Sequence, residues 1–152
     1  MKTLIPKILV VDDEIYNFKL IHAILHNYQA EVIYAHSGFE AIEKCKENFD
    51  ITLVIMDIKM KGMNGFEAAQ KILEFRNNIP IIYQTAYAKD FLKDDLMISI
   101  GSGYLEKPIK KDMLISEIRK NIRLVIKEDK IQVSLERESN FSFKNMFFSL
   151  FS

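Results

Sequence analysis

Two short apolar runs that end in aspartate limit the fold of this chain more than any other feature. Lys7 to Val11 read KILVV and lead into Asp12 and Asp13, and Thr52 to Met56 read TLVIM and lead into Asp57. A run that is apolar at nearly every position is typical of a strand buried on both faces of its sheet. We therefore expect two central strands, with carboxylates where each strand ends.

Weaker strand patterns and stretches with helical spacing fill most of the remaining sequence. The additional strand candidates are Glu31 to Ala35, Pro80 to Gln84 and Tyr104 to Lys107. A poorly amphipathic helix is expected at about Lys89 to Ser99, where charged residues interrupt the apolar ones. Four other helices are predicted from apolar residues at helical spacing, namely Phe18, Ile21, Leu25 and Tyr28; Ala41, Ile42, Cys45 and Phe49; Phe66, Ala69, Ile72 and Leu73; and Leu114, Ile118, Ile122 and Val125.

The alternation of strands and helices predicts the fold class. Strands separated by single helices and short connections indicate a parallel sheet covered on both faces, which is a doubly wound α/β domain. A length of 152 residues fits one such domain with a short appendage. In these sheets the functional crevice lies at the carboxyl ends of the strands, so the residues found there are the site candidates.

Five polar side chains stand at the carboxyl ends of the predicted strands. They are Asp12 and Asp13, then Asp57, Thr85 and Lys107. Three carboxylates at one edge would repel one another, and hard oxygen ligands of this kind bind a divalent cation such as Mg²⁺. A carboxylate oxygen could then attack phosphorus while the hydroxyl and the ammonium stabilise the phosphoryl oxygens. The set predicts phosphoryl transfer to a carboxylate.

Each of these residues, taken alone, also has a purely structural explanation. Asp12 or Asp13 could cap a helix that begins near Glu14, and Lys107 could be an exposed turn lysine. The order in which all of them occur is harder to explain in this way.

Four motifs make the chain resemble a response-regulator receiver domain of two-component signalling, similar to the chemotaxis regulators. They are ILVVDDE (Ile8 to Glu14), VIMDIKMKGMNG (Val54 to Gly65), QTAYA (Gln84 to Ala88) and GYLEKPI (Gly103 to Ile109). The resemblance covers Lys7 to Lys127. It implies a flavodoxin-like fold with five parallel strands in the order 2-1-3-4-5 and five flanking helices, with a short C-terminal tail. It also implies a signalling module that is not a conventional enzyme.

The resemblance assigns the metal site and the phosphoryl acceptor. Asp57 would accept the phosphoryl group, while Asp12, Asp13, Asp57 and the backbone carbonyl of Lys59 would hold Mg²⁺ or Mn²⁺. The family usually has proline at the position of Lys61, so the loop after the acceptor is expected to be less rigid.

The same resemblance implies a switch and a means of setting its duration. Thr85 and Lys107 would bind the phosphoryl group, and the movement of Thr85 would let Tyr104 turn and change a partner-binding surface. Lys59 and Tyr87 occupy positions where the family tunes access of water, and their size predicts slow self-dephosphorylation.

Composition narrows the range of partners and locations. Lys plus Arg and Asp plus Glu are both 21, so no net field favours nucleic acid as the main partner. The only cysteine, Cys45, and the absence of a long apolar run predict a cytoplasmic protein without membrane insertion. The resemblance implies a histidine kinase or histidine phosphotransfer protein as donor and a protein target downstream.

The sequence predicts a receiver domain at 1–127 and an extension at 128–152 that is too short for a DNA-binding output domain. Five of the eleven phenylalanines lie between Phe141 and Phe151, and residues 143–151 carry an apolar stripe at helical spacing. Such a stripe would pack on its own domain, on a second copy as a homodimer, on a partner or on a membrane surface. Its single lysine, Lys144, argues against the membrane.

Other functions fit the sequence less well. A phosphatase of the haloacid-dehalogenase type places its nucleophile in a D-x-D motif after the first strand, whereas Ile58 and Lys59 follow Asp57 here. A flavin site would need a Ser/Thr/Gly-rich phosphate loop in place of VDDEIYN. Two alternatives stay open: a receiver from a hybrid histidine kinase, and an unphosphorylated receiver that acts only as a docking module.

Overall fold

The computed structural model describes residues 4–87 and 101–127. The strands are β1 (Lys7–Val11), β2 (Glu31–Ala35), β3 (Ile51–Asp57), β4 (Ile81–Thr85) and β5 (Gly103–Glu106). The helices within these ranges are α1 (Ile15–Leu25), α2 (Gly38–Glu47), α3 (Gly65–Phe75) and α6 (Lys111–Asn121). The helix expected at about Lys89 to Ser99 and the apolar stripe at 143–151 lie outside the described residues.

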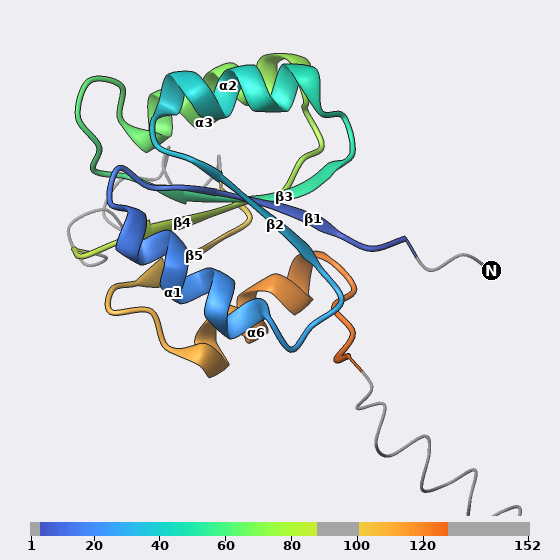
Figure 1. Ribbon diagram of the computed structural model, residues 1–152. Helices are drawn as coiled ribbons and strands as arrows, with labels where there is room; N and C mark the ends of the chain where they lie inside the picture. Colours follow the sequence, from blue (N-terminus) through green and yellow to red (C-terminus); the bar gives the residue numbers. More distant parts are fainter. Residues whose placement is uncertain (1–3, 88–100, 128–152) are drawn as a thin grey trace, which may run out of the picture.

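The strands form one parallel sheet in the order β2-β1-β3-β4-β5, which confirms the predicted fold. Helices α1 and α6 cover one face of the sheet, and α2 and α3 cover the other (Figure 1). Within the described ranges no helix is long and apolar enough to cross a membrane.

The central strands are buried because their side chains are apolar on both faces. Ile8, Leu9, Val10 and Val11 in β1 are all completely buried. Their side chains alternate between the two cores, with Ile8 and Val10 packing on the α1 and α6 side and Leu9 and Val11 on the α2 and α3 side. The continuous apolar pattern therefore predicted the centre of the sheet correctly.

Strands β4 and β5 each shift by one residue relative to the prediction, in opposite directions along the chain. Strand β4 begins at Ile81, after Pro80, whose ring nitrogen has no hydrogen to donate to the sheet. Pro80 still accepts a hydrogen bond through its carbonyl from the backbone N–H of Val54, at 3.0 Å. Strand β5 covers Gly103 to Glu106, so Lys107 lies just beyond it.

Four residues expected on helical faces lie past the helix ends. Tyr28 follows α1 and is buried, while Ile122 and Val125 follow α6. The prediction for Phe49 was wrong, because α2 ends at Glu47 and the backbone at the following residue is no longer helical. Phe49 is 70% exposed instead of packing in the core.

Arg76, just after α3, binds the turn between α2 and β3. Its guanidinium lies 5.2 Å from the centre of the Phe49 ring. It also donates hydrogen bonds to the backbone carbonyls of Cys45 at 3.3 Å, Asn48 at 3.2 Å and Ile51 at 2.7 Å. One cation thus links the end of α2, the turn and the start of β3.

The loop from β3 into α3 closes tightly onto the sheet at Gly65. The Gly65 N–H donates to the Ile58 carbonyl at 2.8 Å, and a Cβ at this position would lie only 2.1 Å from the Asp57 carbonyl oxygen. Helix α3 then starts with a capping box in which Asn64 and Glu67 each accept the other's backbone N–H. Only glycine fits where this loop approaches the strand end.

We expect Gly65→Ala to lower the free energy of unfolding by about 3 kcal/mol, because the added methyl group has to displace backbone. Gly62→Ala is the matched control, since Gly62 has a φ of 77° but an added Cβ would meet only the Phe39 ring, at an ordinary contact distance of 4.0 Å. That variant should lose about 1 kcal/mol, from backbone strain alone. Chemical denaturation measures both, and equal losses would contradict the steric explanation.

Candidate functional site

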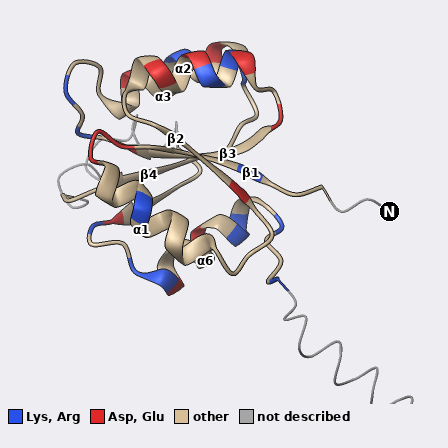
Figure 2. Cartoon of the chain, viewed as in Figure 1, with Lys and Arg blue, Asp and Glu red and all other residues tan. Residues whose placement is uncertain are grey.

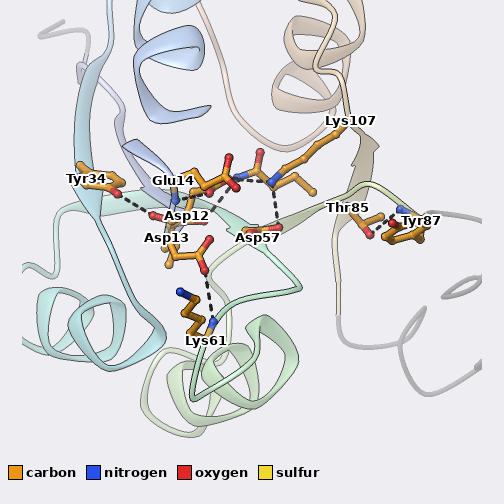
Figure 3. A network of polar contacts seen from close by, with 11 residues as sticks. Asp12, Asp13, Glu14, Tyr34, Asp57, Lys61, Thr85, Tyr87 and Lys107 are labelled. Atoms are coloured by element: carbon orange, nitrogen blue, oxygen red, sulfur yellow. Dashed lines mark hydrogen bonds and ion pairs between the residues drawn. The ribbon is translucent and has the colours of Figure 1, made fainter. Parts of the chain in front are cut away.

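The structure brings the five predicted polar side chains together at the carboxyl edge of the sheet (Figure 3). Asp57 is the last residue of β3 and Thr85 the last of β4, while Asp12 and Lys107 directly follow β1 and β5. Parallel strands that share an edge account for this convergence, because all their carboxyl ends point the same way.

Asp12, Asp13 and Asp57 form a cluster suited to a divalent cation. Each offers one carboxylate oxygen, and the three oxygens lie within 4.8 Å of one another. Asp12 is completely buried, Asp57 is 4% exposed, and Asp13 lies at the surface. An all-oxygen set that is open on one side is the kind of site that Mg²⁺ binds while keeping several waters.

Loops of opposite charge border the cluster. Figure 2 shows acidic residues where β1 leads into α1 and basic residues on the loop between β3 and α3. The two loops touch, because the Asp13 carboxylate accepts a hydrogen bond from the backbone N–H of Lys61 at 3.3 Å. Asp13 is thereby oriented beside the site although it is exposed.

Lys107 bridges the two buried carboxylates. Its ammonium lies 3.0 Å from Asp12 Oδ2 and 3.2 Å from Asp57 Oδ1. The backbone N–H of Lys107 donates a hydrogen bond to the Thr85 carbonyl at 2.8 Å. This bond fixes the backbone of Lys107 beside β4. The Lys107–Pro108 peptide bond is cis.

The pKa values reflect this concentration of buried charge. Burial, and then the negative charge of Asp12, raise the pKa of Asp57 to about 6, although Lys107 acts in the opposite direction. Burial disfavours the charged form of Lys107, but its hydrogen bonds and charge interactions with Asp12 and Asp57 outweigh this and raise its pKa. A proton would therefore compete with any cation that binds at Asp57.

Thr85 and Tyr87 lie on the side of Asp57 that faces away from Asp12 (Figure 3). Thr85 is buried, and its hydroxyl oxygen accepts a hydrogen bond from the Tyr87 N–H at 3.1 Å. The Lys59 ammonium lies 5.6 Å from the centre of the Tyr87 ring. The two residues expected to control water access are thus in contact with each other, a pairing that the sequence did not reveal. Tyr104, on β5, is 46% exposed.

The structural explanation of Asp12 as a helix cap is wrong. The N-cap residue of α1 is Glu14, which makes no side-chain cap. Asp12 Oδ1 instead accepts the Glu14 N–H at 2.8 Å, within the turn before the helix. One site residue was missed: Gln84 is completely buried, and its Nε2 donates to Asp12 Oδ2 at 3.1 Å. The one polar residue within the apolar run IIYQ was its signal in the sequence.

Known proteins share both the sequence pattern and the fold. The profile of the response regulator receiver domain matches residues 8–134. The transcriptional regulatory protein ZraR of Klebsiella oxytoca is 36% identical over 121 residues, which are 77% of this chain and 27% of ZraR. The sensor protein GacS of Pseudomonas syringae is 34% identical over 121 residues, covering 76% of this chain and 13% of GacS. This chain therefore spans about a quarter or less of these relatives.

Solved structures agree with these matches. The response regulator TrrA of Thermotoga maritima, in complex with Mg²⁺ and BeF, superposes with a TM-score of 0.71 at 32% identity, over 77% of this chain and 99% of TrrA. A CheX–CheY–BeF3–Mg²⁺ complex of Borrelia burgdorferi gives a TM-score of 0.69 at 26% identity, over 76% of this chain and 87% of the matched one.

The raised pKa of Asp57 predicts how the metal-free protein responds to pH. Its stabilising contribution is fully present below its ordinary pKa of 3.8 and is lost as the pH rises through about 6. Relative to Asp57→Asn, which does not titrate, the wild type should lose about 3 kcal/mol of stability across this window. Thermal melts with a chelator present measure this difference, and a difference independent of pH would contradict the assignment.

Proposed function

Because the chain belongs to the response regulator receiver family, we propose that it accepts a phosphoryl group on Asp57 in a reaction that requires Mg²⁺. A receiver is a phospho-accepting signalling module and not a conventional enzyme. The observation that carries the proposal is the buried Asp57 carboxylate, bridged by Lys107 to Asp12 and open toward Asp13.

The donor proposed is a phosphohistidine, from a histidine kinase or a histidine phosphotransfer protein. An oxygen of Asp57 attacks phosphorus, the phosphorus–nitrogen bond breaks, and the imidazole leaves with a proton from solvent. Bound Mg²⁺, or Mn²⁺, would offset the charge of the carboxylates and the phosphoryl oxygens. Asp12, Asp13, Asp57 and the Lys59 carbonyl are the ligands we propose for it.

Lys107 and Thr85 are suited to hold the transferred group. The Lys107 ammonium already lies 3.2 Å from Asp57 Oδ1, so a small movement would bring it to a phosphoryl oxygen. The Thr85 hydroxyl oxygen accepts the Tyr87 N–H, which leaves its own hydrogen available to the phosphoryl group. Tyr104, exposed on the neighbouring strand, is the residue that we propose turns inward in response.

We propose residues 1–127 as the receiver and 128–152 as an extension. A downstream protein would bind the altered surface around Tyr104. The Borrelia CheY in complex with CheX gives an example of a receiver held by a protein partner. Similarity to GacS, a sensor protein, and to ZraR, a transcriptional regulator, is compatible with a receiver that is used in either setting.

Intact mass spectrometry after incubation with Mg²⁺ and acetyl phosphate tests the proposal. We expect one phosphoryl adduct on the wild type, and none on Asp57→Asn or without the metal. Asp50→Asn is the matched control, because Asp50 is an aspartate that pairs with Lys7 before β3 and should not affect the reaction. An adduct that persists in Asp57→Asn would contradict the acceptor, and no adduct on a folded wild type would favour a docking module.

The contact between Lys59 and Tyr87 predicts a long-lived phosphoryl group, because the two side chains would restrict the approach of water. Tyr87→Ala should shorten the lifetime at least severalfold, and Lys59→Ala combined with it should add little. Tyr16→Ala, which removes an exposed tyrosine from α1, is the control. Loss of adduct with time measures the rate, and a wild-type half-life of minutes or less would contradict the proposal.

A further inference from the structure

We propose that Gln84 is a positioning residue that holds the Asp12 carboxylate in the orientation in which it binds Mg²⁺. The inference rests on the metal site proposed above and adds a residue that does not itself touch the metal. It begins from a feature that packing does not explain: a polar side chain that is completely buried on an otherwise apolar strand face.

The Asp12 carboxylate is fully buried, so both of its oxygens need hydrogen-bond donors. Oδ1 accepts the backbone N–H of Glu14 at 2.8 Å. Oδ2 accepts from two side chains, the ammonium of Lys107 at 3.0 Å and the amide Nε2 of Gln84 at 3.1 Å. The direction in which Asp12 presents its charge is set by these three donors.

The two side-chain donors differ in what else they do. Lys107 also lies 3.2 Å from Asp57 and is the cation that we expect to move to the phosphoryl group. Gln84 has no such second task, because its other Nε2 contact is the backbone carbonyl of Val11 at 3.4 Å. Among the described residues, Gln84 is therefore the side chain that can keep its bond to Asp12 when Lys107 leaves.

The backbone of Gln84 is fixed from both sides. In the sheet it is paired with Asp57 on β3 and with Leu105 on β5, and its carbonyl accepts the Ile58 N–H at 3.1 Å. A side chain that starts from the middle of a sheet has little freedom to move. Gln84 therefore couples the position of Asp12 to the strand that carries the acceptor.

Gln84 lowers the stability of the fold in a way that a purely structural role would not explain. Its Oε1 is buried and has no hydrogen-bond partner among residues 4–87 and 101–127. A methionine of similar length would avoid that penalty and pack against the same apolar neighbours. An amide has one further advantage over a lysine here, because it orients a carboxylate without adding a positive charge that opposes the metal.

A Mg²⁺ titration by calorimetry tests the inference, at a pH well above the Asp57 pKa of about 6. We expect Gln84→Met to fold with an unchanged or higher melting temperature and to bind Mg²⁺ about tenfold more weakly. Gln70→Met, on the exposed side of α3, is the matched control and should bind like the wild type. Unchanged affinity in a folded Gln84→Met would overturn the inference. Failure of the wild type to bind Mg²⁺ would instead overturn the proposed metal site and this inference with it.

Lys107→Met separates orientation from a general loosening of the site. Removal of the ammonium should strengthen Mg²⁺ binding, since a competing charge is lost, although the same Asp12 oxygen loses a donor. Opposite effects of Gln84→Met and Lys107→Met support the separate roles. A loss of affinity in both would show that any broken bond to Asp12 has the same effect, and would overturn the proposal.

NMR of the ¹⁵N-labelled wild type gives a test that needs no variant to fold. The two side-chain amide protons of Gln84 should exchange slowly with and without Mg²⁺, and their signals should shift over the same titration. Fast exchange of these protons in the Mg²⁺-loaded protein would mean that the bond to Asp12 is broken, which would overturn the inference.

Discussion

The ion pairs that Lys107 makes with Asp12 and Asp57 hold together the carboxyl ends of β1, β3 and β5, on which the arrangement of the site depends. Two buried carboxylates on adjacent strands would repel each other strongly without a cation between them. Strand β5 lies two positions away from β3, so the side chain of Lys107, which directly follows β5, has to be long to reach across β4. A lysine is long enough for this, and its ammonium lies between the two carboxylates, where its positive charge offsets theirs.

Most of the fold could be predicted because its strongest signals are local. Continuous apolar runs such as Lys7 to Val11 identified the central strands, and parallel topology then placed Asp12, Asp57 and Thr85 at one edge. Helix ends were less accurate. Phe49 fits a helical face by spacing, yet the backbone leaves the helix before it and the ring stacks on Arg76 instead. Spacing does not report where a helix ends.

The contacts among site residues could not be predicted, because they depend on side-chain positions in three dimensions. Lys59 and Tyr87 lie far apart in the sequence, and only the packing of two loops brings the ammonium over the ring. Gln84 was visible as a polar residue in an apolar strand, but its bond to Asp12 depends on the alternation of β4 side chains relative to β1. Sequence patterns give the face of a residue more readily than its partner.

The hydrogen bonds of Arg76 affect how the domain can respond to a change at Asp57. Its guanidinium joins the end of α2 to the start of β3 through three carbonyls, at the edge of the sheet opposite to the carboxylates. The first residue of β3 is therefore tied to the neighbouring turn, while the last residue of the same strand is Asp57. We expect a displacement that begins at Asp57 to be taken up by the loops beside it, while the start of β3 stays in place.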